Sequence, residues 1–564
     1  MILKESELKI KRKLEKLYGN DINEIYDEIK YKVNGFIELN PNMKNINIWV
    51  DEKDIFLITY GNSIISKSTH PFENLNEFSK RYLKNHIKNI HLLPFFPYSS
   101  DDGFSIIDYF KVNENFGTWK DIENLNENFD LMFDCVINHI SAKSEWFKEY
   151  ISGEEKYKNF FIEAELSDEL KKVTRPRALP LLNEFETANG KKNIWTTFSR
   201  DQIDLNYKSK ELLLEIIDVV LFYVSKGSRF LRLDAIGYLW KEIGTSCIHL
   251  DNTHLVIQLF RDILNIVAPS TVLISETNVS HKENISYFGN GINEAQMVYQ
   301  FPLPPLVLHA IHFGDGRYLS NWAEELKLNS ERTTFFNFLA SHDGIGLMPA
   351  KDILPKKDIE KVVEQVKKNG GYVSYKDNPD GTQSAYELNI NYFDALISDN
   401  DTENDKINKF ILAQSILLSI IGVPAIYIHS LVGSRNYYDG VKNTGRNRSI
   451  NRELLDFEKL VNEIENKDNL RNKIYQKYVE VIDIRKKEVC FHPNANMEIV
   501  DIDNRLFCYK RINGDSEILV INNMSNEEVD ITIDKGYVDI ISNEIIRSKT
   551  TKLKSYQMKW LKSL

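Results

Sequence analysis

The stretch RFLRLDA, residues 229–235, is a short apolar run that ends in an acidic residue, Asp234. The run TVLISET, residues 271–277, repeats this arrangement and ends near Glu276. Continuous apolar runs of this length are typical of parallel strands that are buried on both faces. Acidic residues at the ends of such strands are expected to meet at one edge of the sheet.

Six further apolar runs of the same kind lie on either side of this pair, at 55–60, 89–95, 131–138, 296–301, 335–341 and 423–429. Eight such strands joined by helical connections favour a (β/α)8 TIM barrel, an α/β fold. A doubly wound open sheet is the alternative. The number of strands and the polar residues at their ends favour the barrel.

Two connections are too long for ordinary loops, and they follow the third and seventh strands at about 140–228 and 343–422. Insertions of this length are usually functional or form subdomains. We predict a catalytic barrel at 53–486, after an N-terminal helical extension at 1–52. Short alternating runs with turn signals then predict a C-terminal antiparallel β-domain at 487–564.

The composition is that of an ordinary globular protein, because 42% of the 564 residues are hydrophobic and 27% are charged. A diffuse net charge of -11 argues against a nucleic-acid partner. No run of about 18 apolar residues could cross a membrane, and the charged N-terminus lacks a signal-peptide core. Four cysteines without CxxC spacing indicate buried thiols, so we expect a cytoplasmic protein.

A third acid, Asp343, follows the strand at 335–341. Three carboxylates at the ends of buried strands are costly unless they are paired or used, so they predict a catalytic site at the barrel mouth. Arg232 lies two residues before Asp234 and therefore on the same face of its strand. A single Asp at a strand end is often only a helix N-cap, so this prediction depends on the three acids together.

Four motifs in order along the chain resemble those of the α-amylase superfamily, glycoside hydrolase family 13: DCVINH (134–139), RLDAIGY (232–238), SETN (275–278) and ASHDG (340–344). Three more look like the sucrose phosphorylase subfamily: PFFPYSSDDGFSIIDY (94–109), GTSCIHL (244–250) and NEAQMVYQFPLPPL (293–306). Within that subfamily the chain looks closest to the glucosylglycerate phosphorylases in KSEWFK (143–148), TRPRALPLL (174–182) and GSRN (433–436).

The resemblance implies a retaining double displacement. Asp234 would be the nucleophile, Glu276 the acid and then the base, and Asp343 the group that stabilises the transition state. Retaining carboxylates lie about 5–5.5 Å apart. We expect Arg232 to keep Asp234 ionised, and the nearby carboxylates to raise the pKa of Glu276.

The resemblance also implies a closed pocket for one glucosyl unit. His139 and His342 would hold sugar hydroxyls, and an ion pair of Asp102 with Arg448 would bind the far hydroxyls. Phe104 would stack on the sugar ring, with an ordinary core Phe as the alternative. Two further aromatic residues and the strand arginine complete the expected substrate-binding set: Phe198, Tyr238 and Arg232.

A phosphorylase also needs cations that attract an anion. Arg175, Arg177 and Arg435 are candidates, because a guanidinium binds phosphate or carboxylate with two hydrogen bonds. The alternative for each is an exposed surface arginine. Tyr386 and Glu387 stand where sucrose-acting relatives have a Tyr-Gln pair. An ionised Glu387 would repel phosphate unless it pairs with an arginine, which is consistent with an acceptor other than fructose.

The implied function is reversible phosphorolysis of 2-O-α-D-glucosyl-D-glycerate to α-D-glucose 1-phosphate and D-glycerate. Phosphorolysis of sucrose, sucrose 6'-phosphate or glucosylglycerol, and hydrolysis or transglucosylation on the same barrel, are the alternatives. We expect small-molecule partners, a monomer or homodimer, and no cofactor other than phosphate as a substrate. Asn138 stands where calcium-binding relatives have a ligand, but no acidic cluster completes a site, so we expect no metal.

Overall fold

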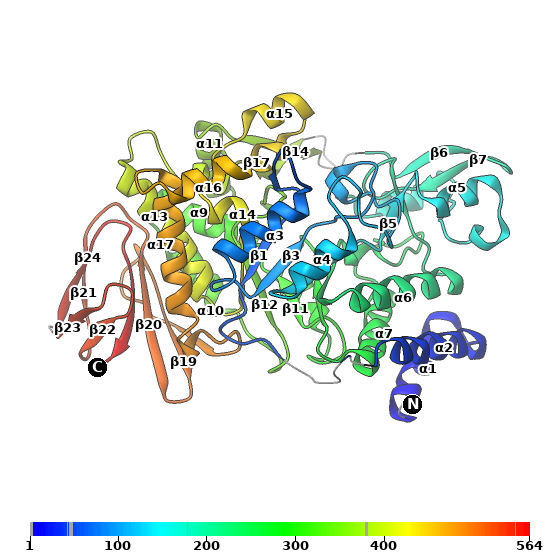
Figure 1. Cartoon of the computed structure of the whole chain (residues 1–564), viewed down its shortest axis with the longest axis horizontal. Helices are drawn as coiled ribbons and strands as arrows, with labels where there is room; N and C mark the ends of the chain where they lie inside the picture. The colour runs from blue at the N-terminus through cyan, green and yellow to red at the C-terminus, as the bar shows by residue number, and fades with distance from the viewer. Residues whose placement is uncertain (1–3, 42, 44–48, 178, 378–381, 548) are drawn as a thin grey trace.

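Eight parallel strands close into a barrel in the computed structural model, which describes residues 4–41, 43, 49–177, 179–377, 382–547 and 549–564 (Figure 1). The strands are β1 (Phe56–Thr59), β3 (Asn89–Leu92), β4 (Asp130–Cys135), β9 (Ser228–Leu233), β10 (Val272–Ser275), β11 (Met297–Tyr299), β12 (Thr334–Phe338) and β16 (Val423–Tyr427). Their order around the barrel is β1-β16-β12-β11-β10-β9-β4-β3. The predicted barrel and its eight strands are confirmed.

Aromatic side chains pack against one another in the barrel interior. The ring of Phe56 lies edge-on to those of Phe230 and Phe336, at centroid distances of 4.7 and 5.1 Å. All three rings are fully buried. These rings fill part of the barrel interior, which is a packed core rather than a pore.

Helices cover the outside of the barrel and alternate with its strands. They are α3 (Pro71–Tyr82), α4 (Trp119–Asn126), α6 (Lys210–Ser225), α7 (Asp251–Val267), α8 (His281–Ile285), α9 (Leu303–Phe313), α10 (Arg317–Glu324), α13 (Glu403–Ser419), α14 (Ile428–Leu431), α15 (Tyr438–Thr444), α16 (Phe457–Glu465) and α17 (Leu470–Arg485). Among the helices described, none combines the length and apolar character that a membrane span needs.

The two long connections form small subdomains at the mouth of the barrel. The first contains β5 (His139–Ser141), α5 (Glu145–Ser152), β6 (Leu182–Thr187), β7 (Gly190–Trp195) and β8 (Gln202–Asp204). The second contains β13 (Ile345–Gly346), α11 (Lys356–Lys368), β14 (Tyr372–Asp377), β15 (Gln383–Asn389) and α12 (Tyr392–Leu396). Antiparallel pairing of β13 with β15 brings Glu387 opposite Gly346, three residues after Asp343.

Two helices form the N-terminal extension, α1 (Lys4–Tyr18) and α2 (Asn23–Leu39), and they lie against α7 and α6 at one end of the molecule (Figure 1). Lys32 in α2 binds Asp218 in α6 at 2.5 Å, and Lys13 in α1 pairs with Asp262 in α7. The remainder of the predicted helical region is not helical where it is described, and residues 1–3, 42 and 44–48 lie outside the described residues.

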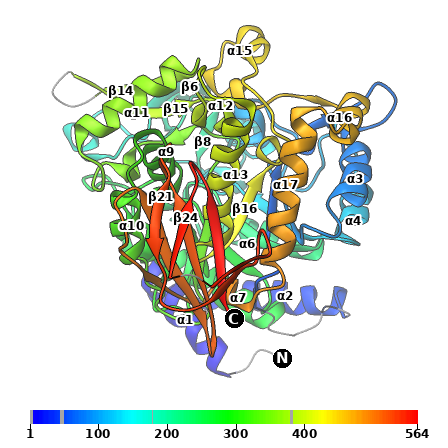
Figure 2. The same ribbon diagram turned by 90° about the vertical axis from the view of Figure 1, so that its left-hand side faces the viewer.

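The C-terminal part is an antiparallel β-domain, as predicted, and Figure 2 shows its strands beside α13 and α17. Its strands are β18 (Asn496–Ile499), β19 (Leu506–Asn513), β20 (Ser516–Asn523), β21 (Val529–Thr532), β22 (Tyr537–Asp539), β23 (Glu544–Ile546), β24 (Thr550–Leu553) and β25 (Met558–Ser563). The sequence pattern missed β23 and β24, which are short and largely exposed. Domain boundaries near residues 52 and 486 remain our proposal.

Gly316 couples the barrel to the C-terminal domain, because its N–H donates to the Asn504 carbonyl at 2.8 Å. A Cβ at this position would lie 2.3 Å from the Leu506 carbonyl oxygen.

We therefore expect Gly316→Ala to lower the free energy of unfolding by about 1–3 kcal/mol, because the backbone must move. The control is Gly35→Ala in α2, where no atom lies within 4 Å, and helix propensity should make it neutral or slightly stabilising. Equal thermal unfolding midpoints for the two variants would contradict this account.

Candidate active site

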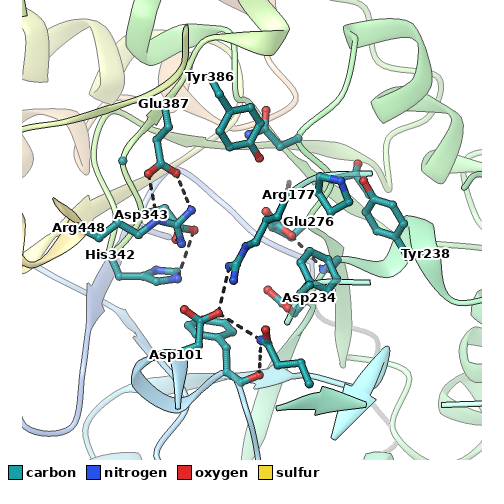
Figure 3. Close-up of a pocket in the computed structure, with 18 of the residues that line it drawn as sticks. Asp101, Arg177, Asp234, Tyr238, Glu276, His342, Asp343, Tyr386, Glu387 and Arg448 are labelled. Atoms are coloured by element: carbon teal, nitrogen blue, oxygen red, sulfur yellow. Dashed lines mark hydrogen bonds and ion pairs between the residues drawn. The ribbon is translucent and has the colours of Figure 1, made fainter. Parts of the chain in front are cut away.

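The three predicted acids meet in one pocket, about 960 Å3 with its open mouth, at the carboxyl ends of the barrel strands (Figure 3). Asp234 follows β9, Glu276 follows β10, and Asp343 lies in the segment after β12. Parallel strands bring these ends together although the residues are far apart in the sequence. The separation of 5–5.5 Å expected between the nucleophile and the acid stays a prediction.

Arg232 lies beneath the acids and joins two of them. Its guanidinium donates to Asp234 at 2.7 Å and to Asp134 on β4, and it lies 3.8 Å from Glu276. The side chain is 2% exposed, so these charges interact without much screening by water. Arg232 therefore supplies the positive charge that a buried cluster of carboxylates requires.

Arg232 lowers the pKa of Asp234, as expected, but burial has the larger effect. Burial raises the pKa of Asp234 above its ordinary value, and the nearby charge of Asp134 adds to this. Arg232 and His139 act in the opposite direction but do not cancel the effect of burial. The result is a carboxylate that is poorly solvated and close to a single guanidinium, which is the environment of a reactive nucleophile.

Glu276 has the raised pKa that the sequence predicted. Burial is the main cause, the charges of Asp234 and Asp343 contribute, and together they raise the pKa to about 7. The N–H of Ala235 donates to its carboxylate at 3.0 Å. Ala235 has a φ of 49°, a left-handed conformation that a non-glycine residue adopts at a cost of about 1–2 kcal/mol. The backbone is thus strained where it holds the acid.

The pKa of Asp343 is lowered, in contrast to that of Glu276. Burial alone would raise its pKa, but Arg448, His342 and Arg452 lower it well below the ordinary value. Arg448 donates to Asp343 at 2.5 Å. The pocket therefore holds one carboxylate that stays ionised and one that gains or loses a proton near neutral pH.

The two predicted histidines are buried and uncharged. Burial lowers the pKa of His139, and it lowers that of His342 to about 3. The Phe104 ring stacks on His342 at 4.8 Å, and the Phe104 carbonyl lies 2.8 Å from Nε2 of His139. Phe104 lines the pocket as predicted, and it also packs against the histidine as a core residue would.

The predicted ion pair between Asp102 and Arg448 is wrong. Arg452 donates to Asp102, and Arg446 lies 3.5 Å from it. Asp101 lines the pocket instead. Asp101 and Asp102 have φ values of 55° and 50°, and this tight turn gives adjacent carboxylates different partners.

Asp101 is held ionised inside the pocket. Arg177 and Gln202 donate to its carboxylate at 3.1 and 3.2 Å. Burial would raise its pKa, but Arg177 and Arg448 lower it to about 2. Asp102 was predicted to line the pocket but Asp101 does so, since nothing in a local pattern separates two neighbouring carboxylates.

The second insertion supplies the partner of Arg448. Its guanidinium binds Glu387 through two hydrogen bonds of 3.0 and 2.6 Å, as Figure 3 shows. Glu387 thus has an arginine partner, without which an ionised carboxylate at this position would repel phosphate. Tyr386 also lines the pocket.

The first insertion supplies an aromatic wall and a cation. Phe198 lies edge-on to Tyr238 at 5.5 Å, and the guanidinium of Arg177 lies 5.6 Å from the Phe198 ring centre. These residues line the pocket as predicted. Several other lining residues were not predicted: Pro176, Gln202, Ile248, Asn278, Val279, Phe301 and Arg452. Gln202 and Arg452 carried no local signal, whereas Asn278 lies inside the quoted motif SETN.

The structure contradicts two of the predicted anion ligands. Arg435 binds Asp394 of α12 at 2.5 Å, and its side chain is 53% exposed. Arg175 is exposed and is absent from the described residues that line the pocket. The Thr174 N–H donates to the Ser246 carbonyl, and among the described residues of 174–182 it is Pro176 and Arg177 that line the pocket.

A lysine ammonium group lies beside Asn138, the residue that stands where calcium-binding relatives have a ligand. Nζ of Lys241 lies 2.8 Å from Oδ1 of Asn138 and 2.7 Å from Oδ2 of Asp204, and all three side chains are buried. Throughout the described ranges, no group of three His, Cys, Asp or Glu residues has the geometry of a metal site. The ammonium group thus provides a positive charge that pairs with Asp204.

Comparisons with known proteins agree with this geometry. The family description "Alpha amylase, catalytic domain" matches residues 80–345. Glucosylglycerate phosphorylase of Escherichia coli (strain K12) is 47% identical over 521 residues, which are 91% of this chain and 92% of the relative. Glucosylglycerate phosphorylase of Spirochaeta thermophila is 48% identical over 481 residues, 85% of this chain and 82% of the relative.

Other relatives are more distant. Sucrose phosphorylase of Streptococcus mutans is 26% identical over 474 residues, 81% of this chain and 92% of the relative. The crystal structure of sucrose 6F-phosphate phosphorylase from Thermoanaerobacter thermosaccharolyticum has a TM-score of 0.74 at 23% identity, covering 88% of this chain and 98% of that one. This last likeness is one of fold.

The raised pKa of Glu276 has a consequence for stability. A carboxyl that titrates at about 7 when folded and near 4.5 when unfolded binds its proton more tightly in the folded state. The contribution of Glu276 to the free energy of unfolding therefore declines as the pH rises from about 4.5 to about 7. We expect Glu276→Gln to stabilise the protein at pH 8.5, by an amount on the order of 2–3 kcal/mol, and to change it little at pH 4.

The control is Asp343→Asn, because the folded state favours the charged form of Asp343. This variant should lower the thermal unfolding midpoint at pH 8.5, where Glu276→Gln raises it. The same direction of change for both variants at that pH would refute the assigned pKa difference.

Proposed function

The chain belongs to the α-amylase family, in the branch that contains the glucosylglycerate phosphorylases, and from this we propose that it is a retaining α-glucosyl phosphorylase acting on 2-O-α-D-glucosyl-D-glycerate. It is an enzyme, and its products are α-D-glucose 1-phosphate and D-glycerate. The main support is the 46–48% identity to three glucosylglycerate phosphorylases over most of the chain. The three acids in one pocket provide the chemistry.

In the first step a carboxylate oxygen of Asp234 attacks the anomeric carbon of the glucosyl unit. The bond from that carbon to the glycerate oxygen breaks, and Glu276 gives its proton to that oxygen. A pKa of about 7 means that Glu276 is partly protonated at neutral pH and can do this. Glycerate leaves, and a glucosyl ester remains on Asp234.

In the second step a phosphate oxygen attacks the same carbon from the face that glycerate has left. Glu276, now ionised, takes the proton from the attacking phosphate hydroxyl, and the ester bond to Asp234 breaks. Two inversions give net retention. Asp343, ionised throughout, stabilises the positive charge that develops on the sugar ring in each transition state.

Asp101 and Arg448 contribute to the part of the pocket that binds the glucosyl unit, together with His139 and His342. Both histidines are neutral, so each can accept or donate hydrogen bonds to sugar hydroxyls without adding charge. Phe104, Phe198 and Tyr238 provide apolar faces for the ring.

Arg177 is the cation that we assign to phosphate and to the glycerate carboxylate. Three arginines line the described pocket, and two of them each bind two other groups of the protein. Arg448 binds Asp343 and Glu387, whereas Arg452 binds Asp102 and the His342 carbonyl. Arg177 has one hydrogen bond to Asp101, at 3.1 Å. It can therefore serve each anion in turn, because the two anions occupy the pocket in different half-reactions.

The coarser features of the proposal follow from the chemistry. The substrates are small molecules, phosphate is a substrate, and no step needs a metal or cofactor. We propose a cytoplasmic location, in keeping with four buried free cysteines, and a monomer or homodimer. A nucleic-acid or membrane partner has no role in this reaction.

The acceptor is tested by phosphate-dependent release of glucose 1-phosphate from glucosylglycerate, glucosylglycerol, sucrose and sucrose 6'-phosphate. We expect glucosylglycerate to have a kcat/KM about 10- to 100-fold above the others, since its carboxylate adds a charge-assisted hydrogen bond of about 1.5–3 kcal/mol. Asp234→Asn is the inactive control. Sucrose as the best donor would refute the acceptor assignment, and equal sugar release without phosphate would indicate a hydrolase.

The anion assignment is tested with Arg177→Gln. Losing one charge-assisted contact costs about 1.5–3 kcal/mol, so the KM values for phosphate and for glycerate should each rise about 10- to 100-fold. Transfer of glucose to a neutral acceptor such as glycerol should change much less. The matched control is Arg175→Gln, two residues earlier and exposed, which should behave as the wild type. A similar loss with neutral and anionic acceptors would exclude Arg177 as the anion ligand.

A further inference from the structure

A second cavity opens over the ends of β16, β1 and β3, three neighbouring strands of the barrel. With its mouth it measures about 910 Å3. We call it the side chamber and define it by Tyr60, Tyr98, Asp102, His429, Asn443 and Arg452. The acids of the active site lie outside it, since they follow β9, β10 and β12.

The floor of the side chamber carries polar groups without partners. Tyr60 is 8% exposed, and its hydroxyl has no hydrogen-bond partner in the described structure. His429 is 2% exposed and uses Nδ1 to bind Ser434 at 3.0 Å, which leaves Nε2 for another partner. A buried hydroxyl without a partner costs about 1–3 kcal/mol, so a ligand that satisfies it gains that free energy.

The charges that line the side chamber are already neutralised. Asp102 pairs with Arg452, and Glu453 pairs with Arg471 at 3.0 Å. Burial lowers the pKa of His429 to about 3, so its ring is neutral. A chamber whose charges cancel offers no net attraction to phosphate or glycerate, and it favours a ligand without charge.

The walls combine aromatic faces with amide and hydroxyl groups. Tyr98, Phe116 and Tyr437 provide the aromatic faces, and Asn62 and Thr444 provide polar groups. Sugar rings and cyclic polyols have apolar C–H faces and a rim of hydroxyls, and proteins bind them with this combination. Asn443 lies exposed at the mouth, on α15.

We propose that the side chamber is a second ligand site, which binds a neutral polyol of hexose size. The ligand's hydroxyls hydrogen-bond to Tyr60, His429 and Asp102, and its ring face packs on the aromatic walls. The site is distinct from the glucosyl pocket and does not depend on the proposed reaction.

The side chamber contacts the active site through Arg452, which lines both cavities. Nε of Arg452 donates to the His342 carbonyl at 2.7 Å, and its guanidinium also binds Asp102. The Tyr60 ring lies edge-on to that of His342 at 5.8 Å. A ligand that orders Asp102 and Tyr60 therefore acts on residues that hold the glucosyl pocket in place.

The test is binding of myo-inositol, measured by saturation-transfer NMR on the full chain. We expect myo-inositol to bind with a Kd of about 1–50 mM, in the range of a small site with few contacts. Tyr60→Phe should weaken binding about two- to tenfold, because it removes only the buried hydroxyl. Asn443→Trp should abolish it by filling the mouth, whereas Asn443→Ala should retain it.

Phe198→Ala, on the wall of the glucosyl pocket, is the control for binding there, and it should leave the myo-inositol affinity unchanged. α-D-glucose 1-phosphate, an anion, should fail to compete with myo-inositol. Absence of myo-inositol binding to the wild type, unaltered binding to both Tyr60→Phe and Asn443→Trp, or loss of binding in Phe198→Ala would each overturn the proposal.

Discussion

The active site depends on the interactions of the Arg232 guanidinium with the carboxylates around it. It binds Asp134 and Asp234 directly, and it lies 3.8 Å from Glu276. Without a buried cation, several carboxylates could not be brought together in a pocket that excludes most water. Because Arg232 is on β9 inside the closed barrel, its position follows from the packing of the strands rather than from a mobile loop.

Different surroundings then separate the properties of three chemically similar acids. Glu276 has few compensating cations, so burial raises its pKa, whereas Asp343 has two arginines close by and keeps its charge. The surroundings of Asp234 are intermediate: burial raises its pKa, and one guanidinium opposes this effect. One pocket thereby holds three carboxyl groups whose pKa values differ because of their neighbours rather than their residue type, as the proposed roles of nucleophile, proton donor and permanent anion require.

The sequence predicted the barrel and the acids well because both depend on local patterns. An apolar run identifies a buried strand, and an acid at its end is visible in the same few residues, as in 229–235. The contacts of Asp101, Arg452 and Arg435 could not be read in this way. Their partners are set by the left-handed turn at 101–102 and by packing between distant loops, which no short motif encodes.

The antiparallel pairing of β13 with β15 unites Asp343, Arg448 and Glu387 into one electrostatic unit drawn from three separate stretches of chain. Suppose that the β14–β15 hairpin were replaced by that of a relative with a neutral residue at position 387. Arg448 would then pair with Asp343 alone, and more of the positive charge of Arg448 would act on the incoming ligand. These three segments therefore have to change together, in evolution as in engineering. Exchanging one without the others alters the electric field at the reacting carbon.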